Sequence, residues 1–493
     1  MTSLGHKPAW ELADLIAKQE ISPLELMRDT LDRMDRVNPG LNAFVALRPE
    51  AALAEAAAMT EKIASGKNLG PLAGLPLGVK DLEDTAGMVT SYGSVPFKDN
   101  MARGDSIQVA RLKAAGAIVV GKTNTPEFGF TGFTKNRLHG ITRNPWNPQR
   151  TPGGSSGGAA AAIAGGLVPL CTGSDAGGSI RIPASYSGCF GLKPSLGRIP
   201  VGPSPFVSYS SMIVMGPLTR SVRDAALYMD CTMGRHPADP HSLPVPATPY
   251  LACIDDLPDR LKIGFSPNLG YAVVQKEIMS CVEKAVKAFE EMGHEVALWP
   301  GSLPDTGDVW SALIATDIYA QLSDVLDKER DQIGRTLVAV LDQTRLMTVA
   351  QLTVIQQLRA KLNARLEKFF DEFDLLLTPT MPTEAFAAEG PPPAEIDGQP
   401  IPLLGAVAFT YPFNFSGHPA ATVPAGLTPS GMPAGLQIVA PRHRDDLVLQ
   451  AARAYEKVRP WNDNWPRRVH FARLGPDRRQ PARCTSRFAP RGS

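Results

Sequence analysis

Residues 152–181 read PGGSSGGAAAAIAGGLVPLCTGSDAGGSIR, and this stretch decides the fold class. Two glycine- and serine-rich loops enclose a short alanine-rich helix, expected over 159–164, and a buried strand, expected over 167–172. A flexible linker is not normally followed by such a helix and strand, so both loops are expected to be ordered. The stretch therefore predicts a helix–strand unit of an α/β protein with a structured loop at each end.

Helices and strands continue to alternate on both sides of this stretch. Upstream, Ser22-Pro23 opens a capping-box sequence for a helix, and a helix expected over 106–115 leads into a buried strand over 117–120. This alternation predicts an α/β fold with a large, twisted, mixed and mostly parallel β-sheet flanked by helices on both faces. Further strands are predicted over 261–265, 374–377, 420–423 and 435–439, and further helices over 49–65, 276–292, 310–365 and 447–456, whereas 200–250 is predicted to be surface loops.

The chain of 493 residues is expected to form one domain over residues 1–465. The motif-bearing core is expected over 60–200, a more variable helical region that covers the site over 200–405, and the last strands and helix of the core over 405–465. Residues 466–493 carry eight arginines and one acidic residue and show no periodicity. They are predicted to be a disordered tail, with binding to an anionic surface as the alternative.

The net charge of +1 gives no global reason to expect nucleic acid or a membrane as partner. No run of about 20 apolar residues is present, and the N-terminus lacks the apolar segment of a signal peptide. The six cysteines form no C-x-x-C pair, which argues against a disulfide framework or a zinc site. We expect a cytoplasmic protein without metal or cofactor; whether it forms a homodimer stays open.

Two short motifs match known functional patterns but lack the context that those patterns need. Residues 116–123 (GAIVVGKT) fit the phosphate-binding loop, yet their apolar centre belongs in a strand and not in a flexible turn. Residues 154–158 (GSSGG) fit the G-x-S-x-G pattern of α/β-hydrolases, with Ser156 as the nucleophile. That pattern also needs an acid and a later histidine, and no later histidine has a telling context. An esterase of the α/β-hydrolase type using Ser156 is kept as an alternative.

A set of motifs in fixed order carries more information than either single match. The motifs are Gly74-Leu-Pro-Leu-Gly-Val-Lys80-Asp81, Gly121-Lys-Thr-Asn-Thr-Pro-Glu127, Arg143-Asn-Pro-Trp146, Gly153-Gly-Ser155-Ser-Gly-Gly158, Gly173-Ser-Asp-Ala-Gly-Gly-Ser179-Ile-Arg181, Cys189-Phe-Gly-Leu-Lys193-Pro, Leu377-Thr-Pro-Thr380 and Gly431-Met-Pro-Ala-Gly-Leu-Gln437. Over roughly residues 5–460 the chain resembles the amidase signature family, and the spacings between the lysine and the two serines match as well. Among its members the chain is most similar to bacterial amidases and nylon-oligomer hydrolases. Fatty acid amide hydrolase and the glutamine-hydrolysing subunit of Glu-tRNA(Gln) amidotransferase are further relatives.

The resemblance implies a serine hydrolase that cleaves amide C–N bonds through an acyl-enzyme. It implies Ser179 as the nucleophile, Ser155 as a proton relay behind a cis Gly154–Ser155 peptide bond, and Lys80 as the base. The implied oxyanion hole and the residues expected to orient the site are, respectively, the backbone of Ala176, Gly177, Gly178 and Ser179, and the side chains of Ser156, Asp175 and Arg181.

A lysine base is chemically demanding. A free lysine has a pKa near 10.4, so only about one in 2,500 would be neutral at pH 7. Lowering that pKa by ~3 units requires ~4 kcal/mol of differential environment, which burial can supply. Lys80 follows Leu77 and Val79 and is expected to emerge from a buried strand. The alternative role for Lys80 is an ion pair with Asp81 or Asp175.

The substrate is expected to be a small apolar or aryl amide, with esters and carbamates as further options. Phe128, Phe133 and Phe206 are candidates for its pocket, although aromatic residues more often belong to a core. The helical stretch 310–365 is expected to cover the site. One alternative activity is glutamine hydrolysis as part of an amidotransferase, which shares the same triad. A non-catalytic binding protein is a second alternative, which the intact triad disfavours.

Overall fold

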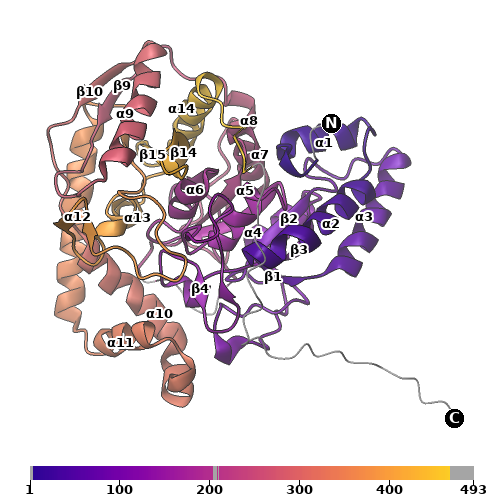
Figure 1. Cartoon of the computed structure of the whole chain (residues 1–493), viewed down its shortest axis with the longest axis horizontal. Helices are drawn as coiled ribbons and strands as arrows, with labels where there is room; N and C mark the ends of the chain where they lie inside the picture. Colours follow the sequence, from indigo (N-terminus) through magenta and orange to yellow (C-terminus); the bar gives the residue numbers. More distant parts are fainter. Residues whose placement is uncertain (1–3, 204–207, 209, 463, 467–493) are drawn as a thin grey trace.

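The computed structural model describes residues 4–203, 208, 210–462 and 464–466. An eleven-stranded sheet runs through the molecule in the order β1-β3-β2-β6-β8-β7-β14-β15-β11-β9-β10 (Figure 1). Two small hairpins, β4–β5 and β12–β13, lie outside it. The strands are β1 (Phe44–Leu47), β2 (Pro76–Lys80), β3 (Ile118–Thr123), β4 (Lys135–Asn136), β5 (Gly140–Ile141), β6 (Leu170–Asp175), β7 (Phe190–Lys193), β8 (Val214–Thr219), β9 (Lys262–Phe265), β10 (Glu295–Leu298), β11 (Leu375–Pro379), β12 (Glu395–Ile396), β13 (Gln399–Pro400), β14 (Ala420–Leu427) and β15 (Pro433–Val439).

The large mixed sheet agrees with the prediction, but its strand directions alternate more than the sequence pattern suggests. Four neighbouring pairs are parallel, and they form two groups, β3-β2-β6 and β11-β9-β10. The other six pairs are antiparallel and include the middle of the sheet. Short connections such as the one between β14 and β15 can join only antiparallel strands. Parallel pairing therefore holds where helix and strand alternate in the sequence, and not at the centre.

Helices cover both faces of the sheet. The helix α6 contacts β14 and β15, and α9 and α14, which touch each other, contact the same two strands. Because one face of a strand pair cannot hold both groups, α6 lies on the face opposite α9 and α14. The helices are α1 (Ala9–Ala17), α2 (Pro23–Leu41), α3 (Pro49–Ala64), α4 (Ile107–Ala114), α5 (Gly157–Ala164), α6 (Arg181–Ser187), α7 (Val222–Thr232), α8 (Tyr250–Cys253), α9 (Lys276–Glu291), α10 (Gly307–Glu329), α11 (Arg335–Thr344), α12 (Val349–Phe370), α13 (Tyr411–Ser416) and α14 (Asp445–Val458).

Two predictions about regular structure need correction. Residues 200–250 are not all surface loops, because β8 and α7 lie within them. A buried apolar strand and a capping box at Ser221 form these elements, and the proline- and serine-rich flanks concealed them. The predicted helical stretch 310–365 is three helices, interrupted at Gly334 and at Thr348, which cap α11 and α12. We call α10 to α12 the helical arm; it extends to the side opposite α1–α3 in Figure 1.

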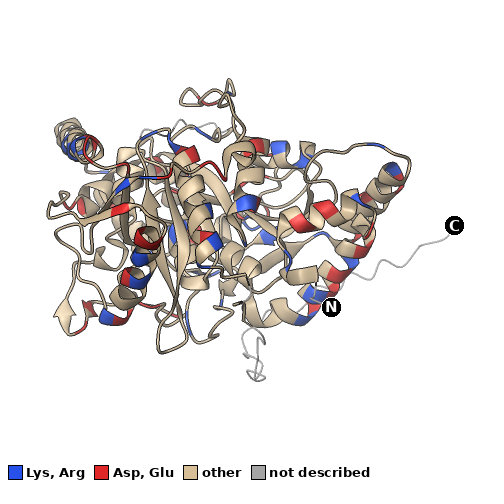
Figure 2. Ribbon diagram, turned by 90° about the horizontal axis from the view of Figure 1, so that it is seen from above, with Lys and Arg blue, Asp and Glu red and all other residues tan. Residues whose placement is uncertain are grey.

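The predicted capping box at Ser22 is present at the start of α2, where the Ser22 hydroxyl accepts a hydrogen bond from the Glu25 N–H. Basic and acidic residues are interspersed along the outer helices (Figure 2). Within the described residues no helix is both long and apolar enough to cross a membrane. Five cysteines are described and all are free thiols. The predicted tail lies outside the described residues, apart from Pro466.

Candidate active site

Lys80 is the last residue of β2, a strand in which every residue is buried. Its Nζ lies 2.8 Å from Ser155 Oγ, 3.0 Å from Ser174 Oγ and 3.2 Å from the Ser174 carbonyl oxygen. A neutral amine has two N–H donors and one lone pair. It can therefore donate to both Ser174 oxygens and accept the Ser155 hydroxyl proton at the same time. The three contacts match the hydrogen-bonding capacity of an uncharged lysine.

Burial lowers the pKa of Lys80 to about 7, against the opposing attraction of the carboxylates Glu83 and Asp175. The side chain has no exposed surface, so the ammonium form loses its hydration without a direct ion pair. Near pH 7 about half of such lysines are neutral, compared with about one in 2,500 for a free lysine. The alternative role as an ion-pair partner of Asp81 is filled by Lys122, whose Nζ lies 3.7 Å from that carboxylate.

Ser155 follows a cis peptide bond after Gly154, as the resemblance implied. Ser155 is only 2% exposed and lies against the loop at Gly129, where an added Cβ would come within 3.0 Å of Ser155 Oγ. Ser156 is fully buried; its hydroxyl donates to the Ser174 carbonyl at 3.4 Å and its N–H donates to the Ser179 carbonyl at 3.1 Å. Ser156 thus ties the two loops together and does not bond to Ser155 itself.

Ser179 lies where the buried core reaches the surface. Within residues 151–200 every residue is buried except Ala176, Gly177, Ser179 and Leu196. Three of these four belong to one loop between β6 and α6, which is called the oxyanion loop below (residues 175–180). In the described residues no hydrogen bond joins the Ser155 and Ser179 hydroxyls directly. Catalytic hydrogen bonds are often long without substrate and shorten in the Michaelis complex.

The carbonyl of each residue from 175 to 179 is held by a different partner. The Asp175 carbonyl accepts from Asn414 Nδ2 at 2.8 Å, and that of Gly178 from the Ile182 N–H at 2.7 Å. The remaining donors are Trp310 Nε1 to Ala176 at 2.7 Å, Thr410 Oγ1 to Gly177 at 2.6 Å, and the Ser156 N–H to Ser179 at 3.1 Å.

The N–H groups of this loop fall into two sets. Those of Gly178 and Ile180 donate to the Asp175 carboxylate at 2.6 and 3.1 Å. Those of Ala176, Gly177 and Ser179 have no hydrogen-bond partner among the described residues, and these are the partly exposed members of the loop. The Gly178 N–H, which the resemblance included in the oxyanion hole, is thus engaged elsewhere, and three free donors remain.

Asp175 and Arg181 form a buried ion pair beneath the loop. Arg181 Nε and Nη2 each donate to the Asp175 carboxylate at 3.0 Å, and Nη1 donates to the Thr410 carbonyl at 2.9 Å. Burial alone would raise the pKa of Asp175, but the Arg181 guanidinium outweighs it and holds that pKa well below its usual range. The carboxylate therefore stays charged and keeps its bonds to the loop N–H groups, as expected for a residue that orients the site.

The predicted pocket residues have different fates. Phe128 stacks on Tyr92 with ring centroids 5.7 Å apart and belongs to an aromatic cluster that packs against α10 and α11. The backbone of Phe133 lies against Gly154, and its ring packs edge-on against Phe386 at 5.7 Å. Phe206 lies outside the described residues. Phe133 is thus next to the serine loop, while Phe128 links the core to the helical arm.

Sequence reasoning missed Trp310, Thr410 and Asn414, all of which hold carbonyls of the oxyanion loop. Their sequence distance from Ser179 hid them. Asn414 carries a usable signal, because a buried amide between Phe413 and Phe415 needs hydrogen-bond partners. Trp310 carries none, since its hydrogen bond depends on the position of α10.

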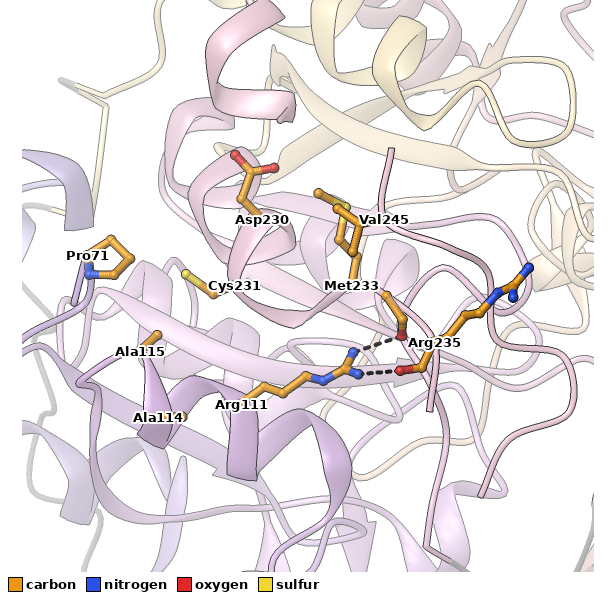
Figure 3. Close-up of a pocket in the computed structure, with 10 residues that line it drawn as sticks. Pro71, Arg111, Ala114, Ala115, Asp230, Cys231, Met233, Arg235 and Val245 are labelled. Carbon is orange, nitrogen blue, oxygen red and sulfur yellow. Dashed lines mark hydrogen bonds between the residues drawn. The ribbon is translucent and has the colours of Figure 1, made fainter. Parts of the chain in front are cut away.

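A surface hollow of about 470 Å³ lies between α4 and α7 and contains none of the motif residues (Figure 3). Arg111 lines it and donates to the carbonyls of Thr232, Gly234 and Arg235. These bonds cap the C-terminal end of α7 and use the guanidinium fully, so Arg111 stabilises the helix end. In the described part of the chain no cluster of three or more His, Cys, Asp or Glu residues could hold a metal ion.

Comparison with known proteins agrees with this geometry. An acylamidase from Rhodococcus erythropolis is 37% identical to this chain, covering 93% of it and 96% of the relative. The crystal structure of a bacterial aryl acylamidase of the amidase signature family superposes with a TM-score of 0.87 at 36% identity, covering 93% of this chain and 97% of that one. A 6-aminohexanoate cyclic dimer hydrolase superposes with a TM-score of 0.84 at 31% identity, covering 94% and 100%.

These similarities define the class of protein: the chain is an enzyme that hydrolyses amide bonds. More specifically, residues 25–449 match the amidase family, and the chain belongs to that family of amidase signature enzymes. The amidotransferase alternative also has a relative. The glutamyl-tRNA(Gln) amidotransferase of Cyanothece sp. contains a polypeptide that is 35% identical over 92% of this chain and 98% of that protein.

Proposed function

We propose that the chain hydrolyses small apolar or aryl amides, with Ser179 as nucleophile, Ser155 as relay and Lys80 as base. The observation that carries this proposal is the 2.8 Å contact between Lys80 Nζ and Ser155 Oγ inside a fully buried site. A serine hydroxyl is a poor nucleophile until a neighbouring base takes its proton. A buried amine that is half neutral near pH 7 is such a base.

The proposed reaction begins with proton transfer. Neutral Lys80 takes the Ser155 hydroxyl proton as Ser155 takes that of Ser179, and Ser179 Oγ bonds to the substrate carbonyl carbon. The resulting oxyanion accepts hydrogen bonds from the free N–H groups of the oxyanion loop, each worth ~3–4 kcal/mol in the transition state. The C–N bond breaks as the nitrogen takes the proton back through Ser155. Water then attacks the acyl-enzyme by the reverse proton path.

The space beside Ser179 supports an apolar acyl group. A Cβ on Gly132 would lie 3.5 Å from Val407 Cγ1 and 3.7 Å from Ile182 Cδ1, and Ile182 also lies against Gly178. Gly132 and Val407 are partly exposed, so this small apolar surface is reached from outside. No charged side chain for the free amino acid of glutamine has been assigned there. Anilides should therefore be better substrates than glutamine, and esters and carbamates present a similar carbonyl.

The test is the purified Ser179→Ala variant measured against a panel of anilides, aliphatic amides, esters, carbamates and glutamine. Turnover of every substrate should disappear together with labelling by a fluorophosphonate. Ser187→Ala is the matched control, because this buried hydroxyl donates to the Pro152 carbonyl at 3.2 Å and touches none of the proposed groups. Full activity of Ser179→Ala would refute the proposal. Glutamine as the preferred substrate would favour the amidotransferase role.

A further inference from the structure

The indole of Trp310, from the first turn of α10, lies on the oxyanion loop although it is 131 residues after Ser179 in the sequence. Its Nε1 donates to the Ala176 carbonyl at 2.7 Å, and its ring stacks on Tyr411 with centroids 5.6 Å apart. We propose that Trp310 is a positioning residue that aims the Gly177 N–H at the oxyanion. This inference rests on the proposed function, since it concerns the loop beside Ser179.

The geometry of the peptide bond links the two ends of this interaction. In a trans peptide unit the C=O and the following N–H point in opposite directions. The peptide between Ala176 and Gly177 is trans, so fixing the Ala176 carbonyl on the side of α10 turns the Gly177 N–H to the other side. That N–H has no partner among the described residues and belongs to a partly exposed residue. It is therefore free to bind a developing negative charge.

The neighbouring peptide shows the same principle with both ends occupied. Thr410 Oγ1 holds the Gly177 carbonyl at 2.6 Å, and the Gly178 N–H on the opposite side donates to Asp175 at 2.6 Å. Successive peptides of the loop thus face alternately toward the buried carboxylate and away from it. Only the peptide between Ala176 and Gly177 is held by a side chain of the helical arm. Its orientation depends on where α10 lies.

The absence of a side chain at Gly177 completes the fit. A Cβ built on Gly177 would collide with Cζ2 of the Trp310 indole, and it would come within 2.7 Å of Cη2. The ring therefore packs directly on the backbone of Gly177. A methyl group at this position would displace the indole while leaving the Gly177 N–H in the chain, which offers an independent way to break the same contact.

The first test is Trp310→Phe, which keeps an aromatic ring and removes the N–H donor. Loss of an oxyanion donor typically lowers kcat 10²- to 10³-fold. Here the donor remains and only its anchor is lost, so kcat for an anilide should fall about tenfold. The value of KM should stay within about twofold, because the interaction strengthens only in the transition state. An aryl boronic acid, which forms a tetrahedral adduct with a serine nucleophile, should bind about tenfold more weakly.

Two further variants separate positioning from simple packing. Gly177→Ala should lower kcat by a similar factor, and the double variant should be no worse than either single variant, because both break one contact. The matched control is Trp461→Phe, since Trp461 Nε1 also donates to a backbone carbonyl, that of Arg220, at 2.8 Å. Trp461→Phe should lower the Tm but leave kcat unchanged.

Three outcomes would overturn the inference. Unchanged kcat in Trp310→Phe would show that the indole N–H has no positioning role. A rise in KM with unchanged kcat would make Trp310 a wall of the substrate pocket instead. Independent, additive losses in the double variant would show that the two residues act separately. Each outcome differs from failure of the proposed function, in which Ser179→Ala would keep its activity.

Discussion

The oxyanion loop and the helical arm are neighbours that are built in contrasting ways. In residues 151–200 almost every side chain is buried, and polar groups such as Asp175 and Arg181 are fully satisfied by one another. In the arm, α12 has 22 residues, of which four are buried. The loop is held by many contacts from all sides, whereas the arm meets the core at a small number of points. Chemistry is thus located in the rigid part, and the arm is the part that can vary with the substrate.

The points where the arm meets the core are few and specific. Trp310 reaches the oxyanion loop, and the Gly334 N–H at the start of α11 donates to Glu127 at 2.8 Å. Arg359 on α12 donates to the carbonyls of Ser210 and Phe415 at 2.8 and 2.6 Å. By contrast, ion pairs within the arm such as Arg330–Asp342 are exposed, and water and salt screen them. The position of the arm should therefore depend on its core contacts and not on its own charges.

The largest effect is expected from Lys80→Ala in the rigid core. Removal of the base should lower kcat about 10⁴-fold, in the range seen for other residues of catalytic triads. In the unchanged protein kcat/KM should rise with pH and level off above about 7, because only neutral Lys80 accepts a proton and burial lowers its pKa to about 7. Steady-state kinetics from pH 5 to 9 check both points. In Lys80→Ala this pH dependence should vanish from the residual rate.

Lys193 offers a matched control for this experiment. Burial, followed by repulsion from Arg181, lowers its pKa to about 7 as well, but its Nζ donates to the Pro194 carbonyl at 2.9 Å and touches neither serine. Lys193→Met should keep the rise of kcat/KM near pH 7. If that rise disappears in Lys193→Met and persists in Lys80→Ala, the assignment of the base is wrong.

The second effect concerns the buried pair under the oxyanion loop. Asp175→Asn leaves Arg181 without its counter-charge, and removal of one member of a buried pair typically costs ~3–5 kcal/mol of stability. The variant also loses the acceptor that holds the Gly178 and Ile180 N–H groups, so kcat should fall about 10²-fold. Because Arg181 holds the pKa of Asp175 below its unfolded value, its contribution to stability is present at neutral pH and is lost as pH falls below about 4.

Asp445→Asn is the control, because Asp445 forms a comparable buried pair with Arg198 at 3.1 Å away from the loop. Both variants should show a similar loss in urea unfolding. Only Asp175→Asn should lower kcat per folded molecule. Equal kcat in both variants would mean that the carboxylate stabilises the fold without orienting the loop.

The same contrast explains what could be predicted from sequence. The strand that ends at Lys80 and the helix after Gly157 were predictable because continuous apolar or small residues indicate their burial. The short distance between Lys80 and Ser155 follows from neighbouring parallel strands β2 and β6, which place their carboxyl ends at one edge. Local sequence therefore contains most of what builds the rigid core.

The contribution of the arm could not be predicted in this way. Its helices read as one stretch because the breaks at Gly334 and Thr348 are weak signals inside a long helical pattern. The contact of Trp310 with Ala176 joins residues 134 apart and depends on tertiary packing alone. Thr410 and Asn414 reach the loop from α13 and its first turn for the same reason. Long-range contacts of single side chains leave no periodic trace in a sequence.

The smallest effect is expected where Glu127 holds the arm. Its carboxylate accepts from Ser94 Oγ at 2.6 Å and from the Gly334 N–H at 2.8 Å, so Glu127→Ala frees the start of α11 from the core. The oxyanion loop keeps its own contacts, so kcat should change less than twofold. KM for a bulky anilide should rise about two- to fivefold, because part of the binding energy is then used to order the arm. Arg330→Ala, which breaks a pair within the arm, should alter neither constant. A tenfold loss of kcat in Glu127→Ala would show that the arm is part of the chemical machinery, and the division between a rigid catalytic core and an adjustable arm would fail.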